Sequence, residues 1–218
     1  MFEIQIYSIF TTKKMKRDHI IPESFYVQSD VVSLSRSLLG KYLYTDIGGK
    51  YCGGKIVETE AYSHINDKAC HSHLQKRTNR TKVMFRRGGV AYVYKVYGIH
   101  DLFNIITNEE EKADAVLVRA IEPTEGLEYM MERRKIDSVS YRLTAGPGVL
   151  SQALGISREQ YGLPLTTGEF IWLEDRGEEV TENDVIASPR VGIDYAGEDA
   201  LLPWRFRIKS NPWTSKAK

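Results

Sequence analysis

The run from Ile56 to Tyr62 contains residue types that hydrolytic chemistry needs. Side chains alternate along a β-strand, so Glu58, Glu60 and Tyr62 share one face if the run is extended. A carboxylate beside aromatic rings is suited to activating a water molecule as a general base. The competing interpretation is a solvated outer face of a sheet, and the run taken alone favours it.

Several residues of metal-binding type follow Glu60, namely His64, Asp67, His71 and His73. Imidazole and carboxylate groups together suit Zn²⁺ or Fe²⁺. The segment has no HExxH pattern or comparable helical spacing, which would hold two imidazoles in a defined geometry. Surface histidines are therefore the better interpretation, and we expect neither a metal nor another cofactor.

Positive charge is concentrated between residues 76 and 87, where six basic residues and no acid occur. They are Lys76, Arg77, Arg80, Lys82, Arg86 and Arg87. Three tyrosines follow at Tyr92, Tyr94 and Tyr97. Basic side chains neutralise phosphates and aromatic rings stack on bases or wedge between them, so the combination indicates nucleic-acid binding. A solvated loop before a tyrosine-rich strand explains these residues equally well.

Other segments carry weaker signals. Gly49–Lys55 has the glycine and lysine positions of a phosphate-binding loop, but Ile56 follows where such a loop needs Ser or Thr for Mg²⁺. The pattern therefore disfavours nucleotide binding and favours a hairpin connection. Asn104 and Arg119 interrupt apolar, strand-like runs. Taken alone, they are explained by a hydrogen-bonded amide and by an arginine whose charged end reaches solvent.

The 218 residues, of which 42% are hydrophobic and 27% charged, have the size and composition of one soluble domain. The net charge of +1 does not decide for or against a nucleic-acid partner, because only the clustering of charge does. Cys52 and Cys70 fit no metal or redox spacing, which favours a reducing compartment. No apolar run reaches the ~18–20 residues of a membrane span. We expect an intracellular protein, cytoplasmic (nucleoid) in a bacterium or nuclear in a eukaryote.

The elements that must position these residues are mostly strands. Periodicity predicts strands at 41–47, 55–62, 91–97, 102–107, 115–121, 169–173 and 204–208, with a short one near Val191. It predicts helices at 29–40, 123–135 and 147–154 and a long loop at 63–89. In the last strand Arg205 and Arg207 alternate with apolar residues and should form a basic outer face. Connections too short for crossover helices favour an antiparallel or mixed α+β domain.

The order of several long motifs resembles the alkyladenine (3-methyladenine) DNA glycosylase family, also called methylpurine-DNA glycosylases. The motifs are Val57–Tyr62, Cys70–Ser72, Met84–Phe85, Tyr92–Gly98, Asn104–Ile105, Leu117–Pro123, Gly146–Pro147, Leu150–Gly155 and Pro203–Phe206. The resemblance covers residues 20 to 210. We accordingly expect a DNA glycosylase domain at 19–213 and an N-terminal extension without an assigned role at 1–18.

The resemblance implies a single domain with a curved, mostly antiparallel sheet surrounded by helices. It implies that Glu60 activates the attacking water and that Arg119 helps to hold this water. The walls around a flipped base would be Tyr62, His71 and Tyr94, and Asn104 would exclude the exocyclic amino group of guanine. Tyr97 resembles the wedge that enters the minor groove. The DNA backbone would be contacted by Arg77, Arg80, Lys82, Arg86 and Arg87.

The expected function is that of a monofunctional DNA repair glycosylase. It would flip an alkylated or deaminated purine out of double-stranded DNA, hydrolyse the glycosidic bond and leave an abasic site, and we expect it to act as a monomer. Three alternatives stay open at this point. Lys55 could serve as the amine of a lyase, the Glu60 and histidine cluster could form a metal-dependent hydrolase, and the basic loop could belong to a binding module without catalysis.

Overall fold

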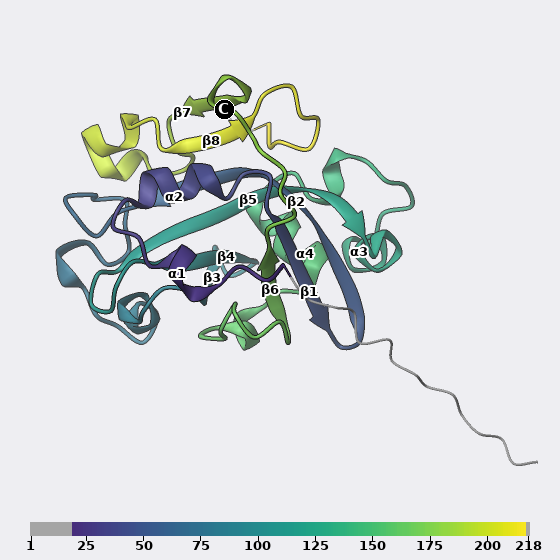
Figure 1. Ribbon diagram of the computed structural model, residues 1–218, viewed down its shortest axis with the longest axis horizontal. Helices are drawn as coiled ribbons and strands as arrows, with labels where there is room; N and C mark the ends of the chain where they lie inside the picture. Colours follow the sequence, from purple (N-terminus) through teal and green to yellow (C-terminus); the bar gives the residue numbers. More distant parts are fainter. Residues whose placement is uncertain (1–18, 217–218) are drawn as a thin grey trace, which may run out of the picture.

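The computed structural model describes residues 19–216, and the expected N-terminal extension at 1–18 lies outside the described residues. The described chain forms one α+β domain around an eight-stranded sheet (Figure 1). All strand pairs are antiparallel, in the order β3-β4-β5-β2-β1-β6, with β8 paired to β2 and β7 paired to β8. The predicted fold class is therefore confirmed.

The strands are β1 (Tyr42–Ile47), β2 (Lys50–Tyr62), β3 (Val90–Val96), β4 (His100–Thr107), β5 (Asp114–Glu125), β6 (Ile171–Glu174), β7 (Val185–Ser188) and β8 (Arg205–Ile208). The α-helices are α1 (Glu23–Tyr26), α2 (Val31–Ser37), α3 (Leu127–Arg134) and α4 (Pro147–Leu154). Short 3-10 helices are η1 (His73–Gln75), η2 (Lys82–Phe85), η3 (Tyr141–Leu143), η4 (Arg158–Gln160), η5 (Glu182–Asp184) and η6 (Asp194–Leu201).

Strand β2 is the central element, because it pairs with β1, β5 and β8 along its length. Its register with β5 shifts at three places, including either side of Glu58, and such bulges bend a sheet. Of the segment that resembled a phosphate-binding loop, Gly49 lies in the turn before this strand, whereas Gly53 and Gly54 belong to it. A Cβ atom on Gly53 would lie 2.0 Å from the Tyr44 ring, and one on Gly54 would lie 2.2 Å from the carbonyl oxygen of Glu122. These glycines therefore serve close strand packing.

The prediction of a helix at 123–135 is wrong in its first turn. Pro123 and Glu125 belong to β5, where Pro123 lies opposite Gly54, and only Leu127–Arg134 is helical. A Cβ atom on Gly54 would lie 2.7 Å from the Cα of Pro123, so the missing side chain allows the two backbones to approach. Gly126, with a φ of +68°, then turns the chain from the strand into α3.

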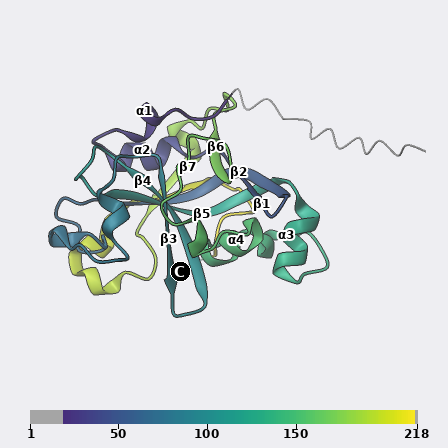
Figure 2. The same ribbon diagram turned by 90° about the horizontal axis from the view of Figure 1, so that it is seen from below.

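The helices cover the sheet from both sides. Figure 2 shows α1 and α2 on one side of the strands and α3 and α4 on the other. Asp30 caps α2, since its side chain accepts hydrogen bonds from the backbone of Val32 and Ser33. The side chains of Leu34 and Leu150 pack into the main apolar core from α2 and α4. No helix within residues 19–216 is long and apolar enough to cross a membrane.

The segment 63–89 is largely irregular, as predicted, but it includes η1 and η2 and a small apolar core of its own around Cys70, Met84 and Phe85. The short strand expected near Val191 lies earlier, at β7 (Val185–Ser188). Pro189 follows directly and cannot donate a ladder hydrogen bond, which ends the strand before Val191. The predicted basic outer face of β8 is also wrong, because Arg205 is buried.

Candidate active site

A cavity of about 650 Å³ opens between the end of β2, the segment 63–89, strands β3 to β5 and the first turn of α4. It brings together seven of the residues predicted from the sequence: Tyr62, His71, Arg80, Tyr94, Tyr97, Asn104 and Arg119. They come from four strands, a loop and a hairpin turn that are far apart in the chain. The residues predicted to surround a base therefore line one cavity.

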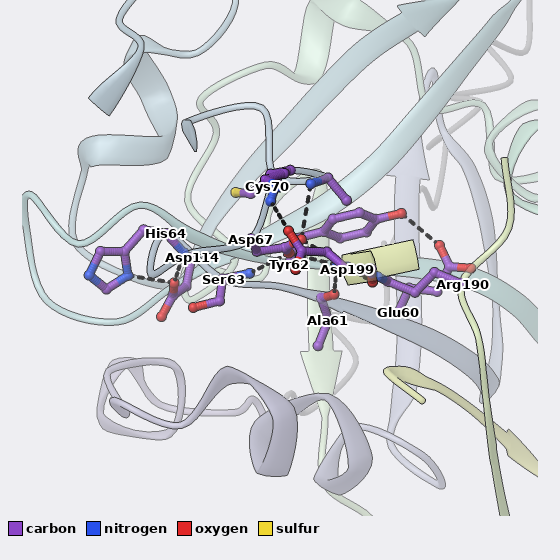
Figure 3. Close-up of polar contacts among 12 residues, drawn as sticks. Glu60, Ala61, Tyr62, Ser63, His64, Asp67, Cys70, Asp114, Arg190 and Asp199 are labelled. Carbon is purple, nitrogen blue, oxygen red and sulfur yellow. Dashed lines mark hydrogen bonds and ion pairs between the residues drawn. The ribbon is translucent and has the colours of Figure 1, made fainter. Parts of the chain in front are cut away.

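The Glu60 carboxylate lies behind the wall of this cavity and is fully buried. Its Oε2 accepts a hydrogen bond of 2.8 Å from the Tyr62 hydroxyl (Figure 3). Its Oε1 accepts one of 2.9 Å from the backbone N–H of Val191 and lies 3.1 Å from Nη1 of Arg119. All three partners line the cavity, so Glu60 lies directly behind its lining.

A second buried carboxylate, that of Glu58, supports Arg119 from behind. Its Oε1 accepts hydrogen bonds from Nε of Arg119 at 2.7 Å and from Nε of Arg205 at 2.8 Å. Ser215 adds its backbone N–H to Oε2 at 2.5 Å and its hydroxyl to Oε1 at 2.8 Å. Burial alone would raise the pKa of Glu58, but the two guanidiniums outweigh it and lower the pKa below its usual value.

Arg205, Glu58, Arg119 and Glu60 form a row of contacting side chains whose charges alternate in sign. We call this row the floor of the cavity. This arrangement explains why Arg205 turns inward on β8, against the prediction from alternation, since β8 pairs with β2 directly beside Glu58. The interpretation of Glu58 and Glu60 as a solvated face is likewise excluded. The side chain of Arg119 is almost fully buried, so it does not reach solvent.

The aromatic wall is held by His71, Tyr92 and Tyr94. The rings of His71 and Tyr94 meet edge to face at 4.6 Å, and Nδ1 of His71 lies 2.9 Å from the Tyr92 hydroxyl. Burial, helped by the positive charge of Arg80, lowers the pKa of His71 to about 4. The imidazole is therefore neutral at neutral pH. Burial also raises the pKa of the Tyr62 phenol, and the neighbouring Glu60 carboxylate raises it further.

Asn104 and Tyr97 lie on the hairpin formed by β3 and β4. The Asn104 side chain is buried and donates to the carbonyl oxygen of Tyr92 at 3.2 Å. Tyr97 is in the turn, with a left-handed φ of +52° and 88% of its surface exposed. Ile99 beside it is 73% exposed. Figure 2 shows this hairpin projecting from the body of the molecule.

The five basic residues predicted to contact DNA have different surroundings. Arg77 pairs with Glu111 and lies 3.8 Å from the Phe85 ring centroid, while Arg87 pairs with Glu23 and Glu109. Arg86 donates to the carbonyl oxygen of Gly162 at 2.9 Å. Arg80 lies 5.9 Å from the Tyr94 ring centroid and lines the cavity.

Lys82 is exposed and forms no ion pair with any residue between 19 and 216. The carboxylates of Glu109 and Glu111 come from a turn that follows β4. No sequence pattern near residues 76–87 indicates that these glutamates pair with Arg77 and Arg87, so the ion pairs could not have been predicted.

The residues that were considered as metal ligands contact different partners in the structure. Nδ1 of His64 lies 2.7 Å from Asp114, His71 contacts Tyr92, and Asp67 pairs with Arg190. Among residues 19–216, no three His, Cys, Asp or Glu side chains come together as a group that could hold a metal ion.

Two further contributors were missed from the sequence. The cavity is also lined by Val191 and by Tyr195, which lies on η6. Behind them, Arg190 forms a fully buried ion pair with Asp67, 123 residues away in the chain. A pairing over this separation leaves no local pattern, and only the fold reveals it.

Comparison with known proteins identifies the family of this chain. The model of the methylpurine-DNA glycosylase family matches residues 24–212. A relative in Chlamydia felis is 42% identical over 190 residues, which are 87% of this chain and 96% of the relative. A relative in Carboxydothermus hydrogenoformans is 42% identical over 197 residues, 90% of this chain and 99% of the relative. The names of both give them as 3-methyladenine DNA glycosylases. The chain belongs to the methylpurine-DNA glycosylase family.

Proposed function

We propose that this protein flips an alkylated or deaminated purine out of double-stranded DNA and hydrolyses its glycosidic bond with a water activated by Glu60, leaving an abasic site. The observation that carries the proposal is the position of the Glu60 carboxylate, buried directly behind an aromatic cavity and held by Tyr62, Val191 and Arg119. The names of the relatives point to 3-methyladenine as one substrate.

The cavity suits a damaged purine because of its aromatic walls. Extruding a nucleotide costs a few kcal/mol, and least when the base is already damaged or mismatched. Alkylation at a ring nitrogen places positive charge on the purine, which favours contact with the faces of Tyr62 and Tyr94. The neutral state of His71 avoids repulsion of such a cation. Asn104 is the candidate for rejecting the exocyclic amino group of guanine.

The floor of the cavity suits the chemistry. As the glycosidic bond breaks, the sugar gains positive charge, which an ionised Glu60 stabilises while it accepts a proton from the attacking water. Arg119 orients the carboxylate and helps to hold the water. Both groups are buried and already in place, so little reorganisation accompanies the reaction.

The hydrolytic route is supported over a lyase route by the position of Lys55. Its Nζ lies 3.5 Å from Glu122 and 3.4 Å from Glu178, and it does not line the cavity. An amine held by two carboxylates elsewhere on the sheet cannot attack a sugar at Glu60. The groups that hold Glu60 all come from one chain, so the proposed chemistry by a monomer needs no residue of a second subunit.

The surface around the cavity supplies candidates for DNA contact. Tyr97, at the tip of the projecting hairpin, is placed to fill the gap left by the flipped base. Phosphates would be contacted by Arg77, Arg80, Lys82, Arg86 and Arg87. Arg77 and Arg87 must exchange their carboxylate partners for phosphates when DNA binds.

The test is base release in EDTA from duplex oligonucleotides with one hypoxanthine or ethenoadenine, and from methylated genomic DNA. Abasic sites are detected by alkaline cleavage and released bases by chromatography. Wild type should release base, Glu60→Gln should not, and Glu128→Gln on the exposed surface of α3 should match wild type. Folded wild-type protein that binds DNA but releases no base from any substrate would contradict the proposal and support a binding module without catalysis.

A further inference from the structure

Arg190 is a buried cation that the proposed chemistry does not use. Its side chain is fully buried and forms a two-pronged ion pair with Asp67, with Nη1–Oδ2 and Nη2–Oδ1 distances of 2.6 and 2.8 Å. The Asp67 carboxylate also accepts the backbone N–H groups of Ser63 and Ala69. Each of its oxygens therefore has two donors, and the turn after β2 is folded around it (Figure 3).

The same guanidinium joins segments that are distant in sequence. Nη1 donates to the carbonyl oxygen of Ala61 on β2 at 2.8 Å, and Nη2 donates to that of Asp199 on η6 at 3.1 Å. Arg190 thus links the end of β2, the following loop and η6 to its own segment. Several residues of these segments line the cavity, among them Tyr62, Ala69, Ile193 and Tyr195.

Arg190 is adjacent to two of the three groups that hold Glu60, namely the backbone N–H of Val191 and the side chain of Tyr62. Val191 is the next residue, so fixing Arg190 fixes the N–H that donates to Oε1 of Glu60. The guanidinium carbon lies 4.8 Å from the centroid of the Tyr62 ring, whose hydroxyl donates to Oε2. It also lies 5.1 Å from the Trp204 ring centroid, so the cation contacts two aromatic rings.

We propose that Arg190 and Asp67 form a positioning pair that holds Val191 and Tyr62 on the Glu60 carboxylate. This inference rests on the proposed function, because it assigns a role through Glu60. A buried ion pair adds little net stability over apolar residues of similar volume, yet its fixed geometry suits exact placement of neighbouring groups. A displacement of ~1 Å in a catalytic group lowers a rate by about a hundredfold.

The experiment measures single-turnover base release at saturating enzyme for Arg190→Gln, Asp67→Asn, the double variant and Arg190→Lys. Under these conditions the rate constant reports the site, whereas the amplitude reports the folded fraction. All variants are compared at a temperature where circular dichroism finds them folded. We expect about a hundredfold loss for Arg190→Gln, a smaller loss for Arg190→Lys, and no further loss in the double variant.

The pH profile and the binding measurement distinguish positioning from a structural role. The charged and titratable groups around Glu60 are Arg119 from β5, Tyr62 and Glu58 from β2, Tyr94 from β3, and Arg190. Losing the Val191 donor destabilises the ionised carboxylate, so the acid limb of the rate profile should move to higher pH. Affinity for a duplex with a reduced abasic site should be unchanged, because that ligand has no base to stack.

The matched control is Arg176→Lys. Arg176 contacts the carboxylate of Glu174 and lies 4.6 and 4.9 Å from the ring centroids of Tyr42 and Tyr44, the same chemistry far from the cavity. It should keep the wild-type rate and profile. Wild-type rates and an unmoved acid limb in Arg190→Gln and Asp67→Asn would overturn the inference alone. A wild-type protein that releases no base would instead overturn the proposed function.

Discussion

The floor of the cavity and the exposed basic segment 76–87, called the rim from here on, use the same kinds of residue in opposite ways. Of this segment, Arg80 lines the cavity itself. On the floor, Glu58, Glu60 and Arg119 are buried, with a hydrogen bond of 2.7 Å from Arg119 to Glu58 and an ion pair of 3.1 Å between Arg119 and Glu60. On the rim, Arg77 and Arg87 pair with carboxylates while about half of each side chain is exposed to solvent. Buried charges are preorganised for chemistry, whereas exposed ones exchange partners easily and are screened by salt.

The largest expected effect comes from breaking the floor. Glu58→Gln leaves Arg119 and Arg205 buried without their shared counter-charge, and removing one partner of a buried pair costs about 3–5 kcal/mol. Urea unfolding should detect this loss. On the rim, Arg77→Ala should change the unfolding free energy by at most about 1 kcal/mol. Equal losses in the two variants would contradict the distinction.

The burial of His71 should make the stability of the protein depend on pH. Its pKa is lowered from 6.5 to about 4 by burial, so the unfolded chain binds more protons between these values. The free energy of unfolding should therefore not depend on His71 titration above pH 6.5. As the pH falls from 6.5 to about 4, it should decrease by about 3 kcal/mol. His71→Gln should abolish this component. The difference between wild-type and variant unfolding free energies, measured against pH, should slope in this window and be flat above it.

The hairpin tip should affect DNA handling without affecting folding. Tyr97→Ala removes an exposed ring, and loss of one stacking ring costs about 1–3 kcal/mol of binding. Base release from duplex DNA below saturation should fall by about tenfold or more, while the melting temperature is unchanged. Release from a single-stranded substrate should fall less, since no gap in a duplex must be filled. An equal loss on both substrates would contradict the wedge assignment.

The smallest effect concerns salt. Lys82 has no carboxylate partner in the described chain, so Lys82→Ala should lower the slope of log affinity against log salt by about 1. Arg87→Gln should lower it less, because Glu23 and Glu109 already neutralise that guanidinium. Fluorescence anisotropy with labelled duplex over a salt series measures both slopes. An equal change of slope in the two variants would contradict the prediction that a cation paired with carboxylates contributes less to the salt dependence than an unpaired one.

Much of the site was predictable because its residues lie in local patterns. Alternation on one strand places Glu60 and Tyr62 on the same face, and the structure finds the Tyr62 hydroxyl on the Glu60 carboxylate. The helix at 147–154 was predicted with its bounds, since Pro147 and Gly155 mark its ends. The fold class followed from short connections between strands.

The sequence by itself determined most of the strands, the family resemblance and the residue types around the pocket, because these depend on periodicity and on motif order. Only the tertiary structure decided how the charges pair. Arg205 turns inward to Glu58, Arg190 reaches Asp67, and Arg87 meets Glu109. Alternation tells which face of a strand a residue occupies, but not whether a buried counter-charge lies there. That depends on which distant segments the folded sheet brings together, and it decides which cations belong to the floor and which to the rim.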